Sequence, residues 1–504
     1  MGELQAISVG WLSILPPLIA ITLALLTKEV YSSLLVGIFS GMLIYCLNVG
    51  EGVITSIYYM IQMMGEKMGA NGTLIIFLML LGALVVVVTR AGGSRAYGEW
   101  AAKRIRTKRG AMLSTMGLGI VIFIDDYFNC LTVGTVMRPL TDRHHISREK
   151  LAYIIDATAA PICIIAPISS WAAAVASDLG GDGFGMFLQA IPFNFYALLT
   201  LAMLLLLCIF KVDYGPMRKA ELAAMAGAIN DEVEAKDFDG MTVSEKGRVS
   251  DLVIPIVCLI VFSILSMAFV GGFFSGDADF ITAIGEDPSS GLVLGAFFAL
   301  IVAMIMFIPR KLISFKEFML GFVDGAKSMI PAILILIMAW SLSGVCRGMI
   351  GTGEFISGVV SGSSMVINLL PFFVFVVAAF MSFAMGTAWG TFGILLPIVS
   401  MICASPETAF MLVPTIGATL AGSVFGDHCS PISDTTILAS AGAKCDHIKH
   451  VATQLPYTLT VAVICAVGYI LVGLTGNFWL PLIICLALMV GVLMFMRRRQ
   501  QEAA

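Results

Sequence analysis

The sequence has little charge for its length. Only 12% of its 504 residues are Asp, Glu, Lys or Arg, whereas soluble domains have about 25%. Apolar residues make up 59% of the chain, and its mean hydropathy is +0.97. A soluble core cannot bury that much apolar surface, so the excess must face lipid. The composition therefore excludes a secreted, a nucleic-acid-binding or a cytosolic globular protein.

Other common signals are also missing. The eleven cysteines stand mostly alone in apolar runs, where cysteine behaves as a small apolar residue. Cys429 and Cys445 lie near three histidines, but the spacing fits no zinc motif. The N-terminus has no basic run or small-residue cleavage pattern, so we expect its first apolar segment to stay in the mature protein. The absence of a P-loop pattern argues against an ATP-driven pump.

Long apolar runs dominate the chain, and a run of about 20 such residues can cross a bilayer. We expect eleven spans, at 8–27, 30–49, 72–91, 150–176, 186–210, 251–271, 289–309, 328–347, 408–440, 452–474 and 477–496. Two further stretches, 111–140 and 366–400, are too long for one span and contain polar or glycine-rich breaks. Each is predicted to be a re-entrant hairpin or two short spans. The sequence thus predicts an all-α polytopic membrane protein.

The charges between the spans predict its orientation, because Lys and Arg prefer the cytoplasmic side. Segments 90–109, 138–150 and 310–327 are basic, and the chain ends in Arg497, Arg498 and Arg499. Segment 272–288 has four acidic residues and no Lys or Arg. We therefore expect the N-terminus outside and the C-terminus in the cytoplasm.

The two halves of the chain resemble each other. Arg90 matches Arg347, Pro139 matches Pro397, and Pro167-Ile-Ser-Ser170 matches Pro431-Ile-Ser-Asp434, all at nearly the same separation. Equivalent segments fall on opposite sides of the membrane, so the repeat is predicted to be inverted, as in many secondary transporters. The predicted parts are a first repeat (1–210), a cytoplasmic linker (211–250), a second repeat (251–474) and an extra span with a basic tail (475–504).

Acidic residues within apolar segments are costly, so each is a candidate functional group. Asp125 and Asp126 stand at the turn of the first hairpin, close to Asn129. Asp156 and Thr158 precede Pro161, and a proline in a helix frees backbone carbonyls that a cation can bind. These residues are candidates for a cation or proton site. Two structural alternatives remain. Asp125 and Asp126 would then form a polar hairpin tip in water, and Asp156 would pair with Arg148.

The second half contains the densest polar cluster, Gly426-Asp-His-Cys-Ser-Pro-Ile-Ser-Asp-Thr-Thr436. Asp427 and Asp434 are about two helical turns apart and flank Pro431, so a broken helix would place both beside one ion. The hairpin tip Gly386-Thr-Ala-Trp-Gly-Thr391 lies at the equivalent position of the second half. The predicted cation and proton ligands are Asp427, Asp434, Ser433, Thr435, Thr387, Thr391, Asp126, Asp156 and Thr158, with sodium on Asp427 and Asp434.

These motifs, with Asp125-Asp-Tyr-Phe128 and Asp156-Ala-Thr-Ala-Ala-Pro161, resemble the NhaC family of sodium/proton antiporters over most of the chain. The resemblance implies a sodium-coupled exchanger of the ion-transporter superfamily in a bacterial inner membrane. That family also includes malate/lactate exchangers. On this basis we expect a homo-oligomer in the lipid bilayer that exchanges cytoplasmic sodium for external protons. We expect no enzymatic activity and no cofactor, sodium being the transported ion.

The expected mechanism is alternating access with competition between sodium and a proton. Sodium prefers oxygen ligands, and protonation of a carboxylate removes its attraction for the cation. His428 is a candidate pH-responsive neighbour because imidazole titrates near neutral pH. The main alternative is exchange of a small carboxylate or amino acid in a cavity near Asn129, Trp171 and Trp389. A further alternative is an intramembrane aspartyl protease that uses Asp427 and Asp126, but the sequence lacks the first glycine of the Gly-x-Gly-Asp motif of that class. A passive channel is also disfavoured, because a channel would not need a tight carboxylate cluster.

Overall fold

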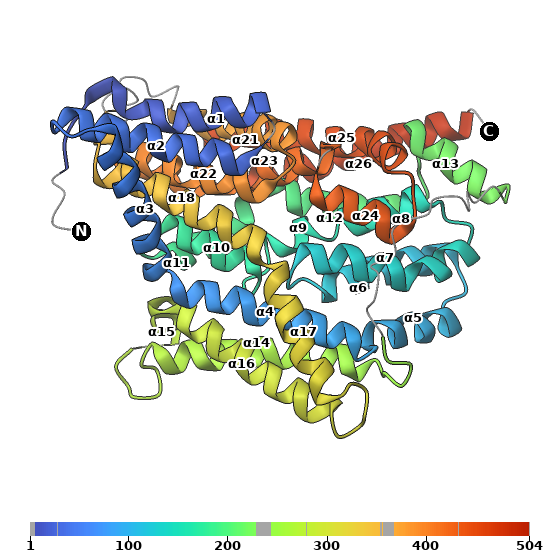
Figure 1. The fold of residues 1–504 in the computed structure, drawn as a ribbon. Coiled ribbons are helices and arrows are strands. Elements are labelled where there is room, and N and C mark those ends of the chain that lie inside the picture. The colour runs from blue at the N-terminus through green and yellow to red at the C-terminus, as the bar shows by residue number, and fades with distance from the viewer. Residues whose placement is uncertain are drawn as a thin grey trace.

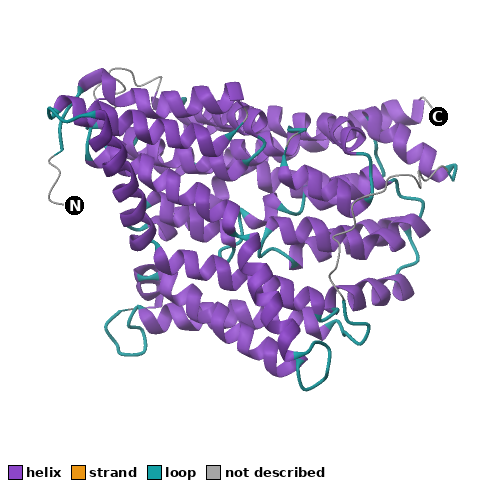
Figure 2. Cartoon of the chain, in the orientation of Figure 1, coloured by secondary structure: helices purple, strands orange, loops and turns teal. Residues whose placement is uncertain are grey.

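All regular elements that the structure describes are helices. The computed structural model describes residues 6–27, 29–227, 243–278, 280–352, 355, 367–431 and 433–502. Figure 2 shows helices joined by turns and loops throughout these ranges. In Figure 1 most of the long helices run in one common direction across the molecule and stack in layers. This confirms the predicted all-α fold class.

The first half contains these helices: η1 (Gly10–Ile14), α1 (Leu15–Thr27), α2 (Val30–Asn48), α3 (Val53–Ala70), α4 (Gly72–Arg90), α5 (Gly93–Arg104), α6 (Lys108–Val121), α7 (Asp126–Arg143), α8 (Arg148–Asp156), α9 (Ala160–Cys163), α10 (Ser170–Leu179), α11 (Gly183–Ala190), η2 (Ile191–Phe193), α12 (Phe195–Phe210) and α13 (Gly215–Met225).

The second half contains these: α14 (Ser250–Val270), α15 (Phe280–Glu286), α16 (Pro288–Phe307), α17 (Phe315–Ser328), α18 (Ile330–Gly348), α21 (Leu370–Met385), α22 (Ala388–Ile402), η3 (Ala409–Met411), α23 (Leu412–Cys429), α24 (Asp434–Ala443), α25 (His447–Thr475) and α26 (Trp479–Glu502).

Eight helices among the described residues are long and apolar enough to cross a membrane, or nine with the bent pair α11–η2 and α12. The sequence predicted eleven spans. The difference arises at 8–27, where α1 has only 13 residues, and at 150–176, which is divided into three short helices. Segment 186–210 bends by 44° where Asn194 interrupts it. Broken segments can still cross a bilayer together, so the count of eleven stays a prediction.

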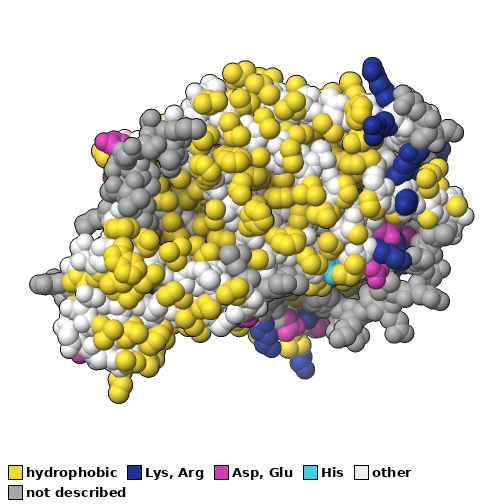
Figure 3. Space-filling model, turned by 90° about the horizontal axis from the view of Figure 1, so that it is seen from above, with side chains coloured by type: hydrophobic (Ala, Val, Ile, Leu, Met, Phe, Trp, Pro, Cys, Tyr) yellow, Lys and Arg dark blue, Asp and Glu magenta, His cyan; other side chains and the backbone are white. Residues whose placement is uncertain are grey.

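The surface carries the apolar side chains that the composition requires. Figure 3 shows a face covered largely by hydrophobic side chains, with Lys and Arg along its right edge and in a smaller group at its lower margin. Exposed apolar residues occur on many of the long helices, including α14, α16, α21, α25 and α26. A continuous apolar surface with charge confined to its edges is the pattern of a protein that spans a bilayer.

Two of the apolar segments are broken inside the molecule. Segment 408–440 divides at Ser430 and Pro431 into α23 and α24, at the predicted proline. Segment 150–176 divides after Asp156 into α8, α9 and α10. A serine begins the helix after each break: Ser169 accepts a hydrogen bond from the N–H of Ala172, and Ser433 accepts one from the N–H of Thr436. The breaks therefore place helix ends and their polar groups in the interior.

Each expected hairpin consists of two helices with a short turn. In the first, α6 and α7 are joined by residues 122–125. In the second, α21 and α22 are joined at Gly386, whose φ of +69° is a left-handed conformation that favours glycine, and at Thr387. Helix α7 packs against α24, and a Cβ added to Gly134 would lie 2.5 Å from the carbonyl carbon of Gly442. This close backbone contact holds the first hairpin against the second break.

Several helices lie in segments that were not predicted to span the membrane. Helix α3 follows α2, α5 follows α4, and α15 and α17 lie in the charged segments of the second half. The expected solvated linker 211–250 contains α13, which has Pro216 in its first turn followed by good helix formers such as Ala, Leu and Met. Residues 228–242 of this linker lie outside the described part of the chain.

Candidate functional site

The polar groups at the helix breaks form two neighbouring clusters, each built around a buried aspartate. The first is the Asp427 cluster. Asp427 stands in the last turn of α23 and is 3% exposed. Its Oδ2 accepts a hydrogen bond from the Thr435 hydroxyl (3.1 Å), which lies 3.0 Å from the Ser433 hydroxyl. Its Oδ1 is buried without a hydrogen-bond partner among the described residues. A carboxylate lined by hydroxyl groups is therefore open on one side.

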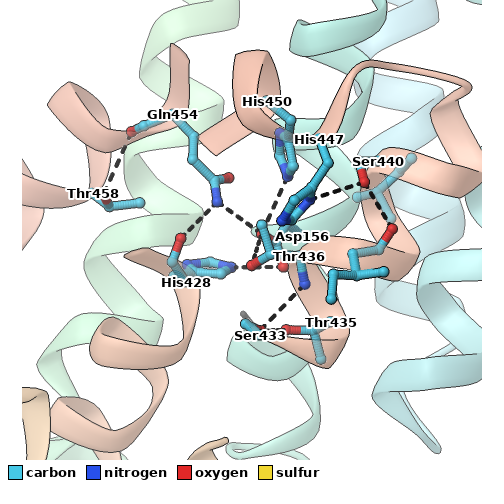
Figure 4. A network of polar contacts seen from close by, with 12 residues as sticks. Asp156, His428, Ser433, Thr435, Thr436, Ser440, His447, His450, Gln454 and Thr458 are labelled. Atoms are coloured by element: carbon cyan, nitrogen blue, oxygen red, sulfur yellow. Dashed lines mark hydrogen bonds and ion pairs between the residues drawn. The ribbon is translucent and has the colours of Figure 1, made fainter. Parts of the chain in front are cut away.

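The second is the Asp156 cluster, shown in Figure 4. Asp156 is the last residue of α8 and is fully buried. Its Oδ2 accepts hydrogen bonds from the Gln454 amide (3.0 Å) and the Thr436 hydroxyl (3.2 Å). The Nε2 atom of His450 lies 3.4 Å from Oδ2, and Nε2 of His428 lies 3.5 Å from Oδ1. This carboxylate thus accepts one hydrogen bond from an amide and one from a hydroxyl group, and two imidazole nitrogens lie slightly further away.

The same contacts join four helices around Asp156. Gln454 of α25 also donates to the backbone carbonyl of His428 on α23 (2.6 Å). His428 is buried, and its Nδ1 lies 3.0 Å from the Tyr196 hydroxyl of α12. The predicted pH-responsive His428 is therefore a direct neighbour of the Asp156 carboxylate rather than of Asp427 alone.

Asp126 lies at the start of α7, beside these clusters. Its carboxyl is buried beside the Trp171 indole and the backbone N–H groups at the start of α7. Asp427 is within electrostatic range of both Asp126 and Asp156. Three buried carboxyl groups from the two halves of the chain therefore share one region of low dielectric, where their charges act strongly on each other.

Asn129 supports this region. Its side-chain amide donates to the carbonyls of Gly119 (2.7 Å), Ile122 (3.0 Å) and Thr158 (3.0 Å). These contacts tie the turn of the first hairpin to the break after α8. The N–H groups of Asn129, a predicted cavity residue, are thus engaged by the backbone.

The predicted aromatic residues of the substrate cavity come together. The rings of Trp171 on α10 and Trp389 on α22 are 5.4 Å apart, and Phe392 packs against both. Both indole N–H groups are buried; that of Trp171 lies near the Asp126 carboxyl, and that of Trp389 has no hydrogen-bond partner among the described residues. Thr387 caps α22 by accepting from the N–H of Gly390, and Thr391 donates to the carbonyl of Thr387. Both threonines thus have local roles in the hairpin tip.

The remaining candidates have different positions. Thr158 lies in the turn after α8, and its hydroxyl donates to the carbonyls of Ile154 and Ile155 in that helix. Asp434 is the first residue of α24, but its side chain lies outside those that the structure describes.

Sequence reasoning missed His450 and Gln454. Their spacing of four residues places them on one helix face, a signal that becomes informative only once α25 is known to pass Asp156.

The two clusters differ in the chemistry that they favour. A hard cation prefers oxygen ligands, so the hydroxyl groups and open carboxylate oxygen of the Asp427 cluster suit a cation such as sodium. The Gln454 amide and the two imidazole rings beside Asp156 favour a charged carboxylate but offer few oxygen ligands to a metal cation, whereas an imidazole ring can bind a proton. Buried carboxylates at breaks in membrane-spanning helices define the chain as a membrane transporter.

Comparison with known proteins identifies the kind of transporter. Residues 172–474 match the model of the Na+/H+ antiporter family. The chain is 39% identical over 484 residues to an uncharacterized protein of Haemophilus influenzae, covering 92% of this chain and 91% of that protein. The chain therefore belongs to the Na+/H+ antiporter family, and it is a secondary antiporter. The family prediction from the sequence motifs is confirmed.

Two further similarities are more distant. The malate-2H(+)/Na(+)-lactate antiporter of Bacillus subtilis is 30% identical over 208 residues, which cover 36% of this chain and 42% of that protein. The structure of Neisseria gonorrhoeae MtrF, described as one of a class of antimetabolite efflux pumps, aligns with a TM-score of 0.44 and 12% identity over 84% of each chain. A score of this size does not establish a common fold.

Proposed function

We propose that the protein exchanges sodium ions for protons, with sodium bound in the Asp427 cluster. The observation that carries this proposal is the buried Asp427 carboxylate, which has the Thr435 hydroxyl on one oxygen and no described partner on the other. Asp126 adds negative charge within the same region. A buried carboxylate that lacks a partner is costly, and a bound cation removes that cost.

The proton is shared by Asp156 and the His428 and His450 rings beside it, so the two ions compete through charge rather than for one oxygen atom. A proton on this group cancels a negative charge within electrostatic range of Asp427 and weakens sodium binding there. Sodium at Asp427 opposes protonation of the group in the same way. The protein changes the side to which its site is open when it carries either ion. Exchange follows because the binding of both ions at the same time is unfavourable.

Corresponding helices in the two halves support alternating access. Helices α10 and α24 have ten residues each and both follow a serine cap, while α4 and α18 have 19 residues each. Helix α4 packs on α17, and α18 packs on α3. These pairs fit two inverted repeats, 1–210 and 251–474, joined by the linker 211–250 and followed by 475–504. Such repeats give two related conformations, each open to one side.

We place the protein in a bacterial inner membrane, as a homo-oligomer that moves sodium out of the cytoplasm and protons in. The basic edge in Figure 3 supports a cytoplasmic C-terminus. In addition, the backbone N–H of Asp213 bonds Gln500 near the end of α26, and its carboxylate bonds Lys150 at the start of α8. The ends of these helices therefore share the proposed cytoplasmic side, with the N-terminus outside.

The test uses purified protein in liposomes that contain a pH-sensitive dye. Sodium added outside should make the lumen more alkaline, because sodium entry drives protons out, and Asp427→Asn should abolish the response. Asp182→Asn is the matched control, because Asp182 is an exposed cap of α11 and Asn also caps helices well. An Asp427→Asn protein that responds to sodium like the wild type would contradict the proposal.

Exchange of an organic anion is the second candidate. The buried indole N–H group of Trp389, which has no partner among the described residues, favours it, since it can donate to a carboxylate. The Bacillus subtilis relative is named for malate and lactate. In the same liposomes, a dye response that requires malate or lactate in addition to sodium would support this candidate over simple sodium/proton exchange.

A further inference from the structure

Helix α25 carries a line of polar side chains that leads from its first turn to Asp156. His447, His450 and Gln454 follow each other at spacings of three and four residues, which places them on one helix face. His447 is partly exposed, whereas His450 and Gln454 are fully buried. Figure 4 shows both rings on the side of α25 that faces Asp156. A titratable side chain thus stands near the surface, and a second one stands next to the buried carboxylate.

His447 can gain or lose a proton without losing its contacts. Its Nε2 lies 2.7 Å from the carbonyl oxygen of Pro431, and its Nδ1 lies 3.2 Å from the Ser440 hydroxyl oxygen. When the ring is charged, both nitrogens donate, and the Ser440 hydroxyl donates to the carbonyl of Ile437 at 2.8 Å. When the ring is neutral, the Ser440 hydroxyl turns and donates to Nδ1. The surroundings therefore accept both states of the ring.

His450 is the next group toward the interior. Its Nε2 is 3.4 Å from Oδ2 of Asp156, and its Nδ1 has no hydrogen-bond partner among the described residues. An imidazole can take a proton on one ring nitrogen while it releases the proton on the other. The ring therefore has one nitrogen directed at Asp156 and one free to receive a proton.

We propose that His447 and His450 form the proton path between the cytoplasm and Asp156, an inference that rests on the proposed sodium/proton exchange. A proton from water binds His447 and passes across one helical turn to Nδ1 of His450. The proton on Nε2 of His450 then moves to Oδ2 of Asp156. Only N–H and O–H bonds form and break. The ring is left neutral with its proton on Nδ1, and this proton must move to Nε2 before the next one passes. The same steps run in reverse when a proton leaves Asp156 for the cytoplasm.

Charged groups on neighbouring elements surround this path. Asp446 and Lys449 flank His447 on α25, and Lys444 and Cys445 lie in the turn before it. Arg148 and Glu149 of α8 lie near Cys445, and Arg148 donates to the carbonyl of Lys444. At the inner end, Asp156 and His428 are the titratable groups that face His450. The charges near His447 are mixed in sign, so protons and water can reach it from the cytoplasmic side.

The test compares two rates in the same liposomes: proton-coupled exchange, from the dye, and sodium self-exchange, from radioactive sodium. Sodium self-exchange needs no proton. For His450→Gln, the ratio of proton-coupled exchange to sodium self-exchange should fall about a hundredfold, since a positioned acid–base group contributes at least that much. His447→Ala should lower the same ratio, and free imidazole in the buffer should restore it. His144→Gln, which changes a histidine between α7 and α8, should leave the ratio unchanged.

The outcomes separate this inference from the proposed function. If the wild type exchanges sodium but moves no protons, both the proposed function and the path are wrong. If the wild type couples the ions and His450→Gln keeps the wild-type ratio, only the path is wrong. If both rates fall together in His447→Ala and imidazole restores neither, His447 only holds the break at Pro431, and the path is again wrong. Sodium self-exchange by each variant shows that it has folded.

Discussion

Thr435 and Thr436 are adjacent residues of α24 that contact different carboxylates. The Thr435 hydroxyl donates to Asp427 (3.1 Å), and the Thr436 hydroxyl donates to Asp156 (3.2 Å). Changing either to valine removes one hydroxyl and keeps the branched shape of the side chain. The same substitution at two neighbouring positions therefore tests separately whether each carboxylate binds sodium.

The structure gives the expected magnitude. A hydrogen bond or ligand contact to a charged, buried group contributes about 1.5–3 kcal/mol. Because 1.4 kcal/mol corresponds to a factor of ten, Thr435→Val should raise the half-saturating sodium concentration by about 10- to 150-fold. Thr436→Val should change this concentration by less than about twofold, since Asp156 is bonded by nitrogen donors and is not a sodium ligand in the proposed mechanism. Its effect should be on the pH dependence of exchange.

Initial rates of sodium-driven proton flux in liposomes, measured over a range of sodium concentrations and at several pH values, provide both quantities. Thr391→Val is a useful third variant, because its hydroxyl bonds only the carbonyl of Thr387 in the hairpin tip. If Thr436→Val weakens sodium binding as much as Thr435→Val does, the separation of the two clusters is refuted. In that case a single shared site, as the sequence alone predicted, is the better description.

Two further predictions concern stability. Asp251 is fully buried at the start of α14 and is bonded by Arg310 through both carboxylate oxygens. Arg310→Met should therefore lower the free energy of unfolding in mixed micelles by about 3–5 kcal/mol. Adding Asp251→Leu to this variant should restore most of the lost free energy. Equal losses in the single and double variants would contradict this prediction. Asn129→Leu leaves buried carbonyls of the first hairpin without a donor and should cost about 1–3 kcal/mol. An unchanged unfolding midpoint for this variant would show that water replaces the amide.

The sequence predicts the breaks well because their signals are local. Pro431 ends α23 where expected, and Ser433 begins the next helix as a serine cap should. The acidic residues of the two clusters stand out because charge is rare in apolar segments. Gly386 and the flanking apolar runs were likewise enough to place the turn of the second hairpin.

The environment of each carboxylate could not be predicted, because it depends on contacts between distant segments. His450 and Gln454 reach Asp156 from almost 300 positions further along the chain. Nothing near Asp156 in the sequence shows that its neighbours are nitrogen donors. The same limit applies to the bend at Asn194, where the side chain caps α12 by accepting from the N–H of Ala197. Asparagine also occurs inside ordinary spans, so its capping role depends on the backbone conformation.

The structure also indicates which oxygen atoms remain for a cation. A broken helix frees backbone carbonyls, and the sequence suggested that a cation binds them. Side chains of the protein already bond several of these carbonyls. Ser169 bonds the carbonyls of Cys163 and Ala166, and Asn129 bonds the carbonyl of Thr158. Gln454 bonds the carbonyl of His428, and His447 bonds the carbonyl of Pro431. The buried Asp427 carboxylate has one such donor, the Thr435 hydroxyl, and its Oδ1 has none among the described residues. Carboxylates and hydroxyl groups, rather than freed carbonyls, are therefore the oxygen atoms left at these breaks for the proposed sodium ion.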